Sequence, residues 1–167
     1  VEIEVVATPG HTPACSCLKI GNALYTGDTL FMPDFGTGRC DFPGGSAEDL
    51  YDSIKRIYAM PGNTRVFVGH DYQPGGRELA YETTVAKCKE HNIQLRHDTI
   101  CEEFVQWRKE RDAKLRPPRL LWQSLQVNMA AGALPKKNNN GIAYLKMPMN
   151  IFVDSLLVAK YKVMFGK

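Results

Sequence analysis

The chain has 167 residues, of which 44% are hydrophobic and 23% charged, a composition typical of one globular domain and not of a disordered or fibrous chain. Its 21 basic and 18 acidic residues give a formal net charge of +3 without a basic block, which argues against a nucleic-acid partner. No run reaches the roughly 18 apolar residues of a membrane span. Five cysteines, an odd number for a disulfide framework, and the lack of a signal peptide favour a cytoplasmic setting.

The first predicted elements are short strands that each end in a loop with a polar side chain. Residues 2–7 alternate between polar and apolar and lead through a Thr-Pro-Gly turn into His11. Two further β-prone runs, 17–20 and 23–26, flank a Gly-Asn turn, and the second leads into Asp28. Both His11 and Asp28 are therefore expected just beyond the ends of strands.

A long loop, a helix and another strand follow. Residues 31–45 are rich in Gly, Pro and Asp and predict a loop of the kind that holds binding groups. Ser46 is a candidate N-cap for an amphipathic helix that ends at Pro61. Residues 65–68 predict a buried strand whose loop carries His70. Three predicted strands thus end by presenting a His or an Asp.

The rest of the chain is expected to be mainly helical. The expected elements are helices over 78–91, 101–115 and 120–131 and a short strand over 142–145. In the second helix, Phe104 and Trp107 share one face, and the charge pair Arg108 with Asp112 is expected on the other face. Residues 151–167 include an apolar stretch that is expected to dock on the core.

His11, Asp28 and His70 form a candidate metal site. Imidazole and carboxylate are ligands of zinc and of non-haem iron(II), and two histidines with one carboxylate leave positions open for oxygen and substrate. Each residue alone is more often a solvated loop histidine or a turn aspartate. Their shared position after three strands favours a common site.

The motifs around these residues resemble the second half of the metallo-β-lactamase superfamily. They are Thr-Pro-Gly-His-Thr at 8–12, Thr-Gly-Asp-Thr-Leu at 26–30 and Gly-His-Asp-Tyr at 69–72. The loop Phe-Gly-Thr-Gly-Arg-Cys-Asp-Phe-Pro-Gly-Gly at 35–45 is similar to that of persulfide dioxygenases and of the bacterial β-lactamase hydrolase-like proteins. The resemblance implies an α/β fold, the C-terminal half of an αββα sandwich with added C-terminal helices, over 1–150. Residues 151–167 would be a docking segment.

The resemblance also implies a role for each site residue. In the dioxygenase branch two histidines and one aspartate hold a single Fe(II); His11 matches the second of those histidines and Asp28 matches the aspartate. His70 matches the last metal histidine of the superfamily, which lies outside the direct ligands of the single iron in this branch. Tyr72 follows it and would offer a phenol to bound oxygen or substrate.

Two arginines are candidate substrate contacts. Arg39 matches the arginine that meets the glutathione carboxylate, a task that suits a planar bidentate donor. Arg96 is a candidate second anion contact, for which a surface arginine is the simpler interpretation. Cys40, beside Arg39, is either a plain loop residue or a thiolate favoured by the neighbouring cation.

One part of the family pattern is absent from this sequence. The first iron histidine of the family lies in a His-x-His-x-Asp-His motif upstream of the Thr-Pro-Gly-His segment, and the chain has no such motif. His91 and His97 stand in the wrong order and are expected at the surface. The chain then supplies two of three iron ligands. Because Val1 leads directly into a strand, we expect the N-terminal half of the fold to precede it or to bind separately.

Three functions are consistent with these residues. The first is an iron dioxygenase that oxidises glutathione persulfide with O2 to sulfite and glutathione. The second is a binuclear-zinc thioester hydrolase similar to glyoxalase II, in which Asp28 bridges two metals and His70 is a direct ligand. The third is an inactive fragment without an assembled metal site. The loop around Arg39 favours the first, and the oligomeric state, a homo-oligomer included, stays open.

Overall fold

The computed structural model describes residues 1–116 and 118–146. It divides into two compact units, Val1–Lys114 and Leu115–Lys167, the second described as far as residue 146. The predicted boundary at residue 150 and the docking segment over 151–167 lie outside the described residues. None of the described helices is long and apolar enough to cross a membrane, and the five cysteines are free thiols.

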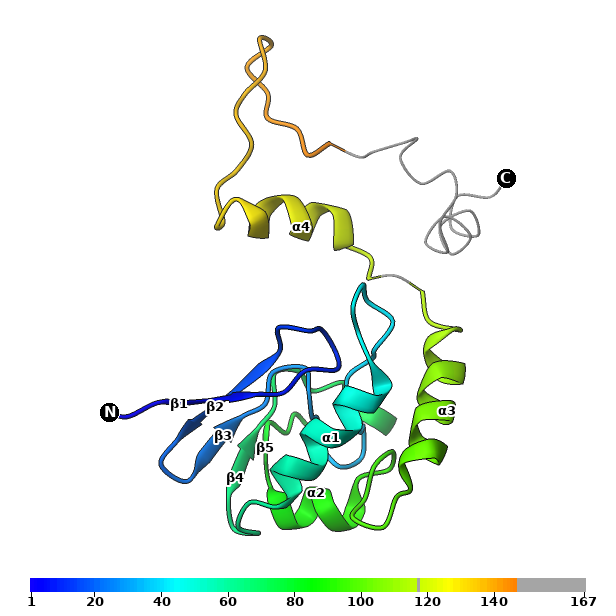
Figure 1. Ribbon diagram of the computed structural model, residues 1–167. Helices are drawn as coiled ribbons and strands as arrows, with labels where there is room; N and C mark the ends of the chain where they lie inside the picture. The colour runs from blue at the N-terminus through cyan, green and yellow to red at the C-terminus, as the bar shows by residue number, and fades with distance from the viewer. Residues whose placement is uncertain (117, 147–167) are drawn as a thin grey trace. The chain divides into compact units, whose positions relative to one another are not determined.

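Short strands in the first unit form one mixed sheet in the order β1-β2-β3-β4-β5 (Figure 1). The strands are β1 (Glu4–Ala7), β2 (Ser16–Ile20), β3 (Ala23–Tyr25), β4 (Arg65–Phe67) and β5 (Glu82–Thr84). Strands β3 and β4 pair in parallel, and the other neighbours pair antiparallel. A parallel pair needs a crossover connection, which here is the long loop followed by α1.

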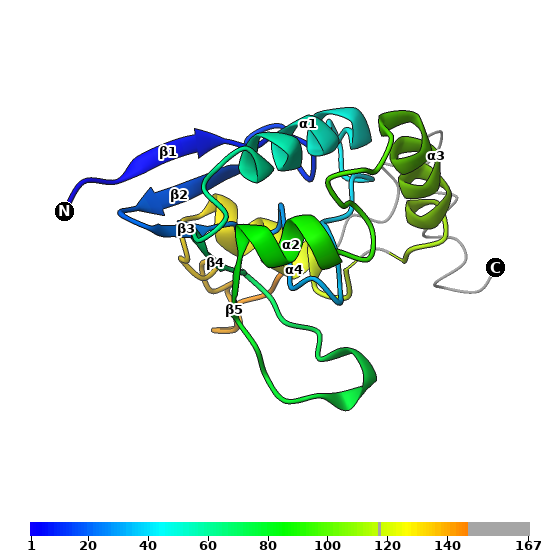
Figure 2. The same ribbon diagram turned by 90° about the horizontal axis from the view of Figure 1, so that it is seen from below.

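The helices of the first unit gather on one face of this sheet (Figures 1 and 2). The helices are α1 (Ala47–Tyr58), α2 (Val85–His91), α3 (Cys101–Asp112) and, in the second unit, α4 (Leu121–Met129). The shared core is formed by sheet residues Cys17, Leu24 and Val66 with Leu50, Ile54, Ile57, Val85, Cys88 and Phe104 from the helices. Each such leucine or isoleucine contributes about 1.5–3 kcal/mol of burial energy, which fixes α1 against the sheet.

The opposite face of the sheet carries exposed apolar side chains. Val5, Leu18 and Tyr25 are each more than two-fifths exposed, and Tyr25 stacks on Phe67 with ring centroids 5.1 Å apart. The first unit thus consists of one sheet and one helical layer. This is one half of the layer order α-β-β-α that the family resemblance implies.

The expected helix over 78–91 is wrong in its first half. Residues 82–84 form β5, and only Val85–His91 is helical. Thr83 pairs with Val66 of β4, and β-branched threonines fit a pleated strand better than a helix. Thr84 then caps α2 by accepting from the amide of Lys87.

The expected strand over 142–145 is also not formed. Ala143 makes only an isolated bridge to Lys137. The second unit is held instead by Gln126 of α4, whose amide donates to the carbonyl of Lys146 and accepts from its N–H, both at 2.8 Å. The helix over Leu121–Met129 confirms the expected helix there.

Ser46 caps α1 as predicted, and its removal should destabilise the protein. The Ser46 hydroxyl accepts from the amide of Asp49 at 3.0 Å. We expect Ser46→Ala to lower the free energy of unfolding by about 1 kcal/mol, measured by urea denaturation. Ser16→Ala, at an exposed serine of β2, is the control and should change it far less. Equal effects of the two substitutions would contradict the cap.

Candidate functional site

Three loops at one edge of the sheet bring His11, Asp28 and His70 together. They follow β1, β3 and β4, which run in the same direction, so their carboxyl ends meet at this edge. His11 Nε2 lies 3.6 Å from Asp28 Oδ2, and His70 Nδ1 lies 2.6 Å from Asp28 Oδ1. The structure therefore unites the three residues that the sequence predicts as a site.

Close packing on α1 positions His11. Gly10 has a φ of +140°, and a Cβ there would overlap the backbone of Leu50 in α1, so this position needs glycine. The Ser53 hydroxyl of α1 donates to the carbonyl of Pro9 at 2.7 Å. The turn before His11 is thereby held by the helix that forms the core.

A backbone carbonyl orients the His11 ring. His11 Nδ1 lies 2.6 Å from the carbonyl oxygen of Arg39, and because a carbonyl only accepts, Nδ1 carries the proton. The other ring nitrogen, Nε2, then has its lone pair available toward Asp28 Oδ2. Phe42 packs edge-on against the ring with centroids 5.2 Å apart. The His11 side chain is only 14% exposed, so its orientation is well defined.

The donor pair His11 Nε2 and Asp28 Oδ2 fits one edge of a metal site. Two donors that each lie about 2.1 Å from a common ion are about 3.4 Å apart at the tetrahedral angle and about 3.6 Å apart at an angle of about 118°. The observed separation is 3.6 Å. His70 contacts the other Asp28 oxygen, as a residue that orients the ligand would. Within the described residues, no group of three or more His, Cys, Asp or Glu side chains is arranged to hold an ion.

An ion-pair network supports the loop that carries His70. The Asp71 side chain is only 1% exposed and accepts from the Arg77 guanidinium, at 2.7 Å to each oxygen, and from the amide of Ala80. The Arg77 hydrogen bonds hold the pKa of Asp71 far below its usual range. Arg77 also pairs with Asp34, so the loop is tied to the long loop before α1.

Aromatic side chains stand beside His70 and Asp28. Tyr72 stacks on Phe35 with centroids 4.2 Å apart and meets Phe31 edge-on at 5.6 Å. Partial burial, and next the negative charge of Asp28, raise the pKa of Tyr72. The phenol therefore keeps its proton at neutral pH. Sequence patterns did not single out Phe31 or Phe35, because an isolated aromatic residue in a loop has no periodic signal.

Arg39 and Arg96 have different surroundings. Arg39 Nε and Nη2 donate to the two Asp41 oxygens at 2.5 and 2.7 Å, and its guanidinium lies over Phe42 at 5.1 Å. Arg96 forms an exposed ion pair with Asp98. Among the described residues, the Arg96 side chain makes no contact with His11, Asp28 or His70. The spare histidines His91 and His97 are exposed.

The interpretation of Arg108 and Asp112 as a solvent-facing charge pair is wrong. The Arg108 side chain is 0% exposed and that of Asp112 is 5% exposed. Arg108 Nη1 donates to the Gly38 carbonyl at 2.6 Å, and Asp112 Oδ2 accepts from the Cys40 amide at 2.7 Å. An i, i+4 pair looks the same in sequence whether it faces water or a loop, so only the packing reveals this contact.

Comparison with known proteins identifies the superfamily of the chain. Residues 1–70 match the family model described as the metallo-beta-lactamase superfamily. The chain is 48% identical over 151 residues to Glyoxylase B2 of Dictyostelium discoideum, covering 90% of this chain and 52% of that protein. The chain belongs to the metallo-beta-lactamase superfamily.

Two further matches carry the name ETHE1, one of them as a persulfide dioxygenase. The chain is 36% identical over 107 residues to the mitochondrial persulfide dioxygenase ETHE1 of Bos taurus, covering 62% of this chain and 38% of that protein. A crystal structure of ETHE1 from Myxococcus xanthus superposes with a TM-score of 0.67 and 36% identity, covering 78% of this chain and 54% of that one. The chain thus spans about half the length, or less, of these matched proteins.

Burial makes Cys40 a poor thiolate. Desolvation raises the pKa of its thiol to about 12, against the smaller opposing effect of the Arg108 charge. We expect iodoacetamide at about pH 8 to alkylate Cys40 at least about 100-fold more slowly in the folded protein than in concentrated urea, where its pKa is about 8.5. Mass spectrometry of the peptide containing Cys40 measures both rates. Equal rates would show that Cys40 is a reactive site thiol.

Proposed function

We propose that this chain forms the Fe(II)-binding part of a persulfide dioxygenase that acts on glutathione persulfide. One observation carries the proposal: His70 Nδ1 hydrogen-bonds Asp28 Oδ1 at 2.6 Å. That contact is too short to hold an ion between the two atoms, so in this arrangement His70 orients Asp28 and is not itself placed as a ligand. Asp28 Oδ2 and His11 Nε2 are left as a pair for one ion, which favours a mononuclear site.

The proposed reaction converts glutathione persulfide, O2 and water into glutathione, sulfite and two protons. Bound Fe(II) would supply open coordination positions at which oxygen and the substrate sulfur meet. His11 and Asp28 would bind the ion, and the described residues place no third protein ligand beside them. His70 hydrogen-bonds Asp28 Oδ1 and so holds the Asp28 carboxylate in one orientation. Five free cysteines suit the reducing cytoplasm that we propose as the setting.

Tyr72 and Arg39 are the proposed substrate contacts. Tyr72 keeps its phenolic proton, so it donates a hydrogen bond to an anionic substrate atom near Asp28. Arg39 offers a planar guanidinium to the glutathione carboxylate. The substrate carboxylate would compete with the Asp41 carboxylate for this guanidinium. Phe35 stacks on Tyr72 and so holds the phenol in place. Arg96 is retained only as a weaker candidate, since its guanidinium faces Asp98.

A thiol-ester hydrolase is the second candidate. The observation in its favour is the 48% identity to Glyoxylase B2, against 36% to ETHE1 of Bos taurus. In that case zinc would replace iron, and His70 would have to leave Asp28 and become a direct ligand. The metal content separates the candidates: about one iron per chain for the dioxygenase, two zinc ions for the hydrolase and none for an inactive fragment.

Oxygen uptake tests the proposed activity. With the protein in its natural, full-length form, we expect glutathione persulfide to drive O2 consumption with sulfite as product. His11→Ala should reduce the rate to background because it removes an iron ligand. His91→Ala, at an exposed histidine, is the control and should keep the rate. Cleavage of S-lactoylglutathione without oxygen uptake would overturn the dioxygenase and favour the hydrolase.

Arg39→Ala tests substrate binding. We expect KM for glutathione persulfide to rise about tenfold or more while kcat changes little, because the guanidinium contacts a part of the substrate remote from the sulfur. The His11 contact uses the Arg39 backbone, which the substitution leaves in place. Arg65→Ala is the control, since Arg65 also forms a two-point pair with a carboxylate, that of Glu82, but on the sheet. A fall in kcat at constant KM would remove Arg39 from this role.

A further inference from the structure

The backbone of residues 37–40 lies between the candidate metal ligands and α3. On its inner side, the Arg39 carbonyl accepts from His11 Nδ1 at 2.6 Å. The Gly38 amide donates to the carbonyl of Thr29 at 3.4 Å, and a Cβ on Gly38 would overlap the backbone oxygen of Asp28. The inner side of this loop is therefore in direct contact with the candidate site.

The outer side of the same loop is held by two side chains of α3. Arg108 Nη1 donates to the carbonyl of Gly38 at 2.6 Å and to the hydroxyl and carbonyl of Thr37 at 3.1 and 3.3 Å. Asp112 Oδ2 accepts from the amide of Cys40 at 2.7 Å. Arg108 and Asp112 thus hold the two residues that flank Arg39, and with them the carbonyl that His11 uses.

Stability alone does not explain why these charges are buried. Removing a charge from water costs several kcal/mol, and an apolar pair of similar volume is often as stable. Arg108 and Asp112 approach each other only to 3.5 Å, and Arg108 Nε and Nη2 and Asp112 Oδ1 have no hydrogen-bond partner in the described part of the chain. Their well-formed hydrogen bonds go to the loop.

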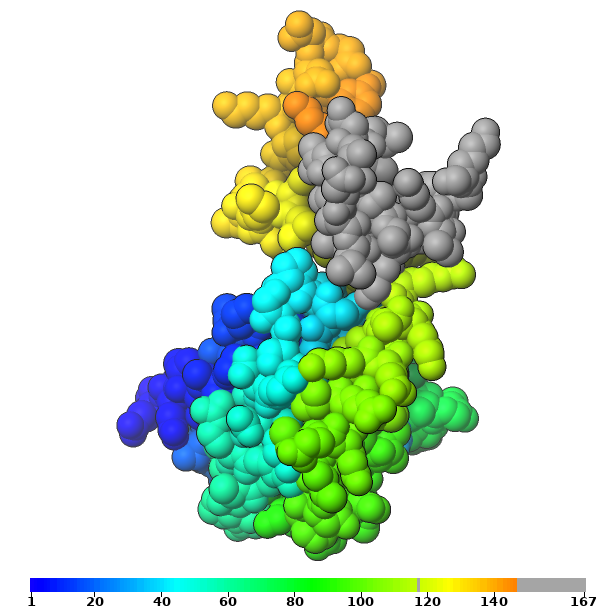
Figure 3. Space-filling model, turned by 45° about the vertical axis from the view of Figure 1, so that its right-hand side comes forward, coloured from blue at the N-terminus to red at the C-terminus, as the bar shows by residue number. Residues whose placement is uncertain are grey.

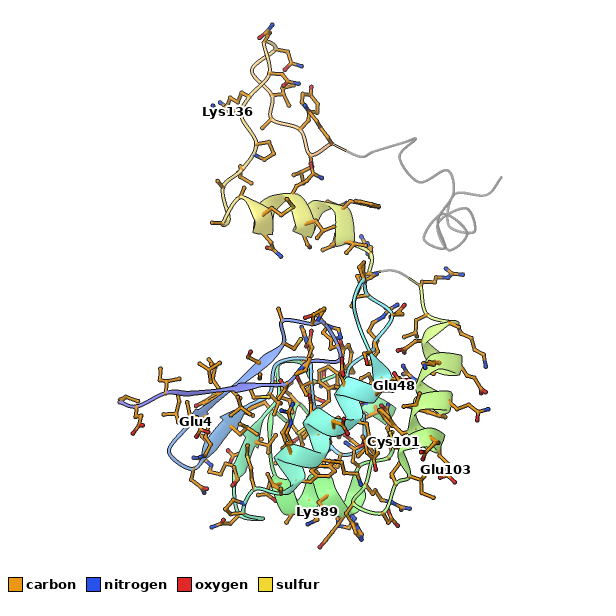
Figure 4. The ribbon with its side chains drawn as sticks, in the orientation of Figure 1. Glu4, Glu48, Lys89, Cys101, Glu103 and Lys136 are labelled. Atoms are coloured by element: carbon orange, nitrogen blue, oxygen red, sulfur yellow. The ribbon has the colours of Figure 1, made fainter. Side chains whose placement is uncertain are left out.

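The helix itself is anchored independently of the loop. Lys109 pairs with Glu48 of α1 at 2.6 Å, and the two helices lie side by side on the surface (Figure 3). Figure 4 shows Glu48 near the start of α1, beside α3. Tyr51 of α1 also donates to the carbonyl of Thr99, just before α3, at 2.9 Å. A helix fixed to the core is a rigid support for the loop.

We propose that Arg108 and Asp112 are positioning residues that, through the backbone of residues 37–40, set the ring tautomer and the metal affinity of His11. With the Arg39 carbonyl in place, Nδ1 keeps the proton and Nε2 is the ligand atom. If the loop shifts, His11 loses the acceptor that selects this tautomer. Contacts of this kind, one step removed from a metal, typically change its affinity by about 10–100-fold.

The inference rests on the metal site of the proposed function but not on its reaction. The tautomer is read in metal-free protein from the ¹⁵N shifts of His11 in long-range ¹H–¹⁵N NMR spectra, above the pH at which the ring is protonated. Metal affinity is measured with zinc against a competing chelator. A negative oxygen-uptake result with an altered tautomer in the variants would overturn the dioxygenase and leave this inference intact.

Arg108→Met with Asp112→Leu is the main variant. Because both charges are replaced by apolar groups of similar size, the fold should persist, measured by urea denaturation. We expect a mixture of His11 tautomers in place of one form and an affinity for zinc lower by about 10–100-fold. Glu48→Gln, which removes the negative charge that pairs with Lys109 but no contact to the loop, is the matched control and should keep both readouts.

A folded double variant with the original tautomer and zinc affinity would overturn the inference. If the double variant does not fold, Arg108→Lys serves instead, since it keeps the buried charge but replaces the Nη1 that donates to Thr37 and Gly38 by an ammonium on a shorter side chain. We expect Arg108→Lys to lower the zinc affinity in the same direction by a smaller factor. An unchanged tautomer and affinity in this variant would equally refute the role of Arg108.

Discussion

The hydrogen bond from His11 Nδ1 to the carbonyl of Arg39 links the candidate chemistry to the fold. It leaves the lone pair of Nε2 available and points it at Asp28 Oδ2, 3.6 Å away. This bond requires that α1 holds the turn before His11 and that α3 holds the residues on either side of Arg39. These two helices come from distant parts of the chain. The site therefore depends on the same helix layer that buries the core, and its ligand geometry is as rigid as that layer.

Two ion-pair systems support the loops on either side of Asp28. The first, Arg108 with Asp112, holds the loop of residues 37–40, and the second joins Asp71 to Arg77 beside His70. Only the first is buried at both partners, at a cost that an apolar core would not have, because Arg77 is part-exposed. Both also supply several directed hydrogen bonds to backbone or carboxylate. Loops without regular secondary structure gain a defined shape from such contacts.

The proposed function rests on the arrangement of donors at Asp28. Asp28 uses one oxygen for His70 and has the other beside His11, so its two oxygens have separate tasks. In the proposed hydrolase, by contrast, His70 would be a direct metal ligand and could not keep this hydrogen bond. Sequence similarity does not decide between the dioxygenase and the hydrolase, because the chain is similar both to a glyoxylase and to a persulfide dioxygenase. Local geometry at Asp28 is thus the more specific guide to function.

The sequence by itself determined the strands before His11, Asp28 and His70, the Ser46 cap and the superfamily, since alternation, turn residues and motifs are local patterns. It did not determine β5, because threonines at 83–84 become a strand only through pairing with β4. Only the tertiary structure decided that Arg108 and Asp112 face a loop instead of water. Helical spacing specifies which residues share a face, and packing alone decides what that face contacts.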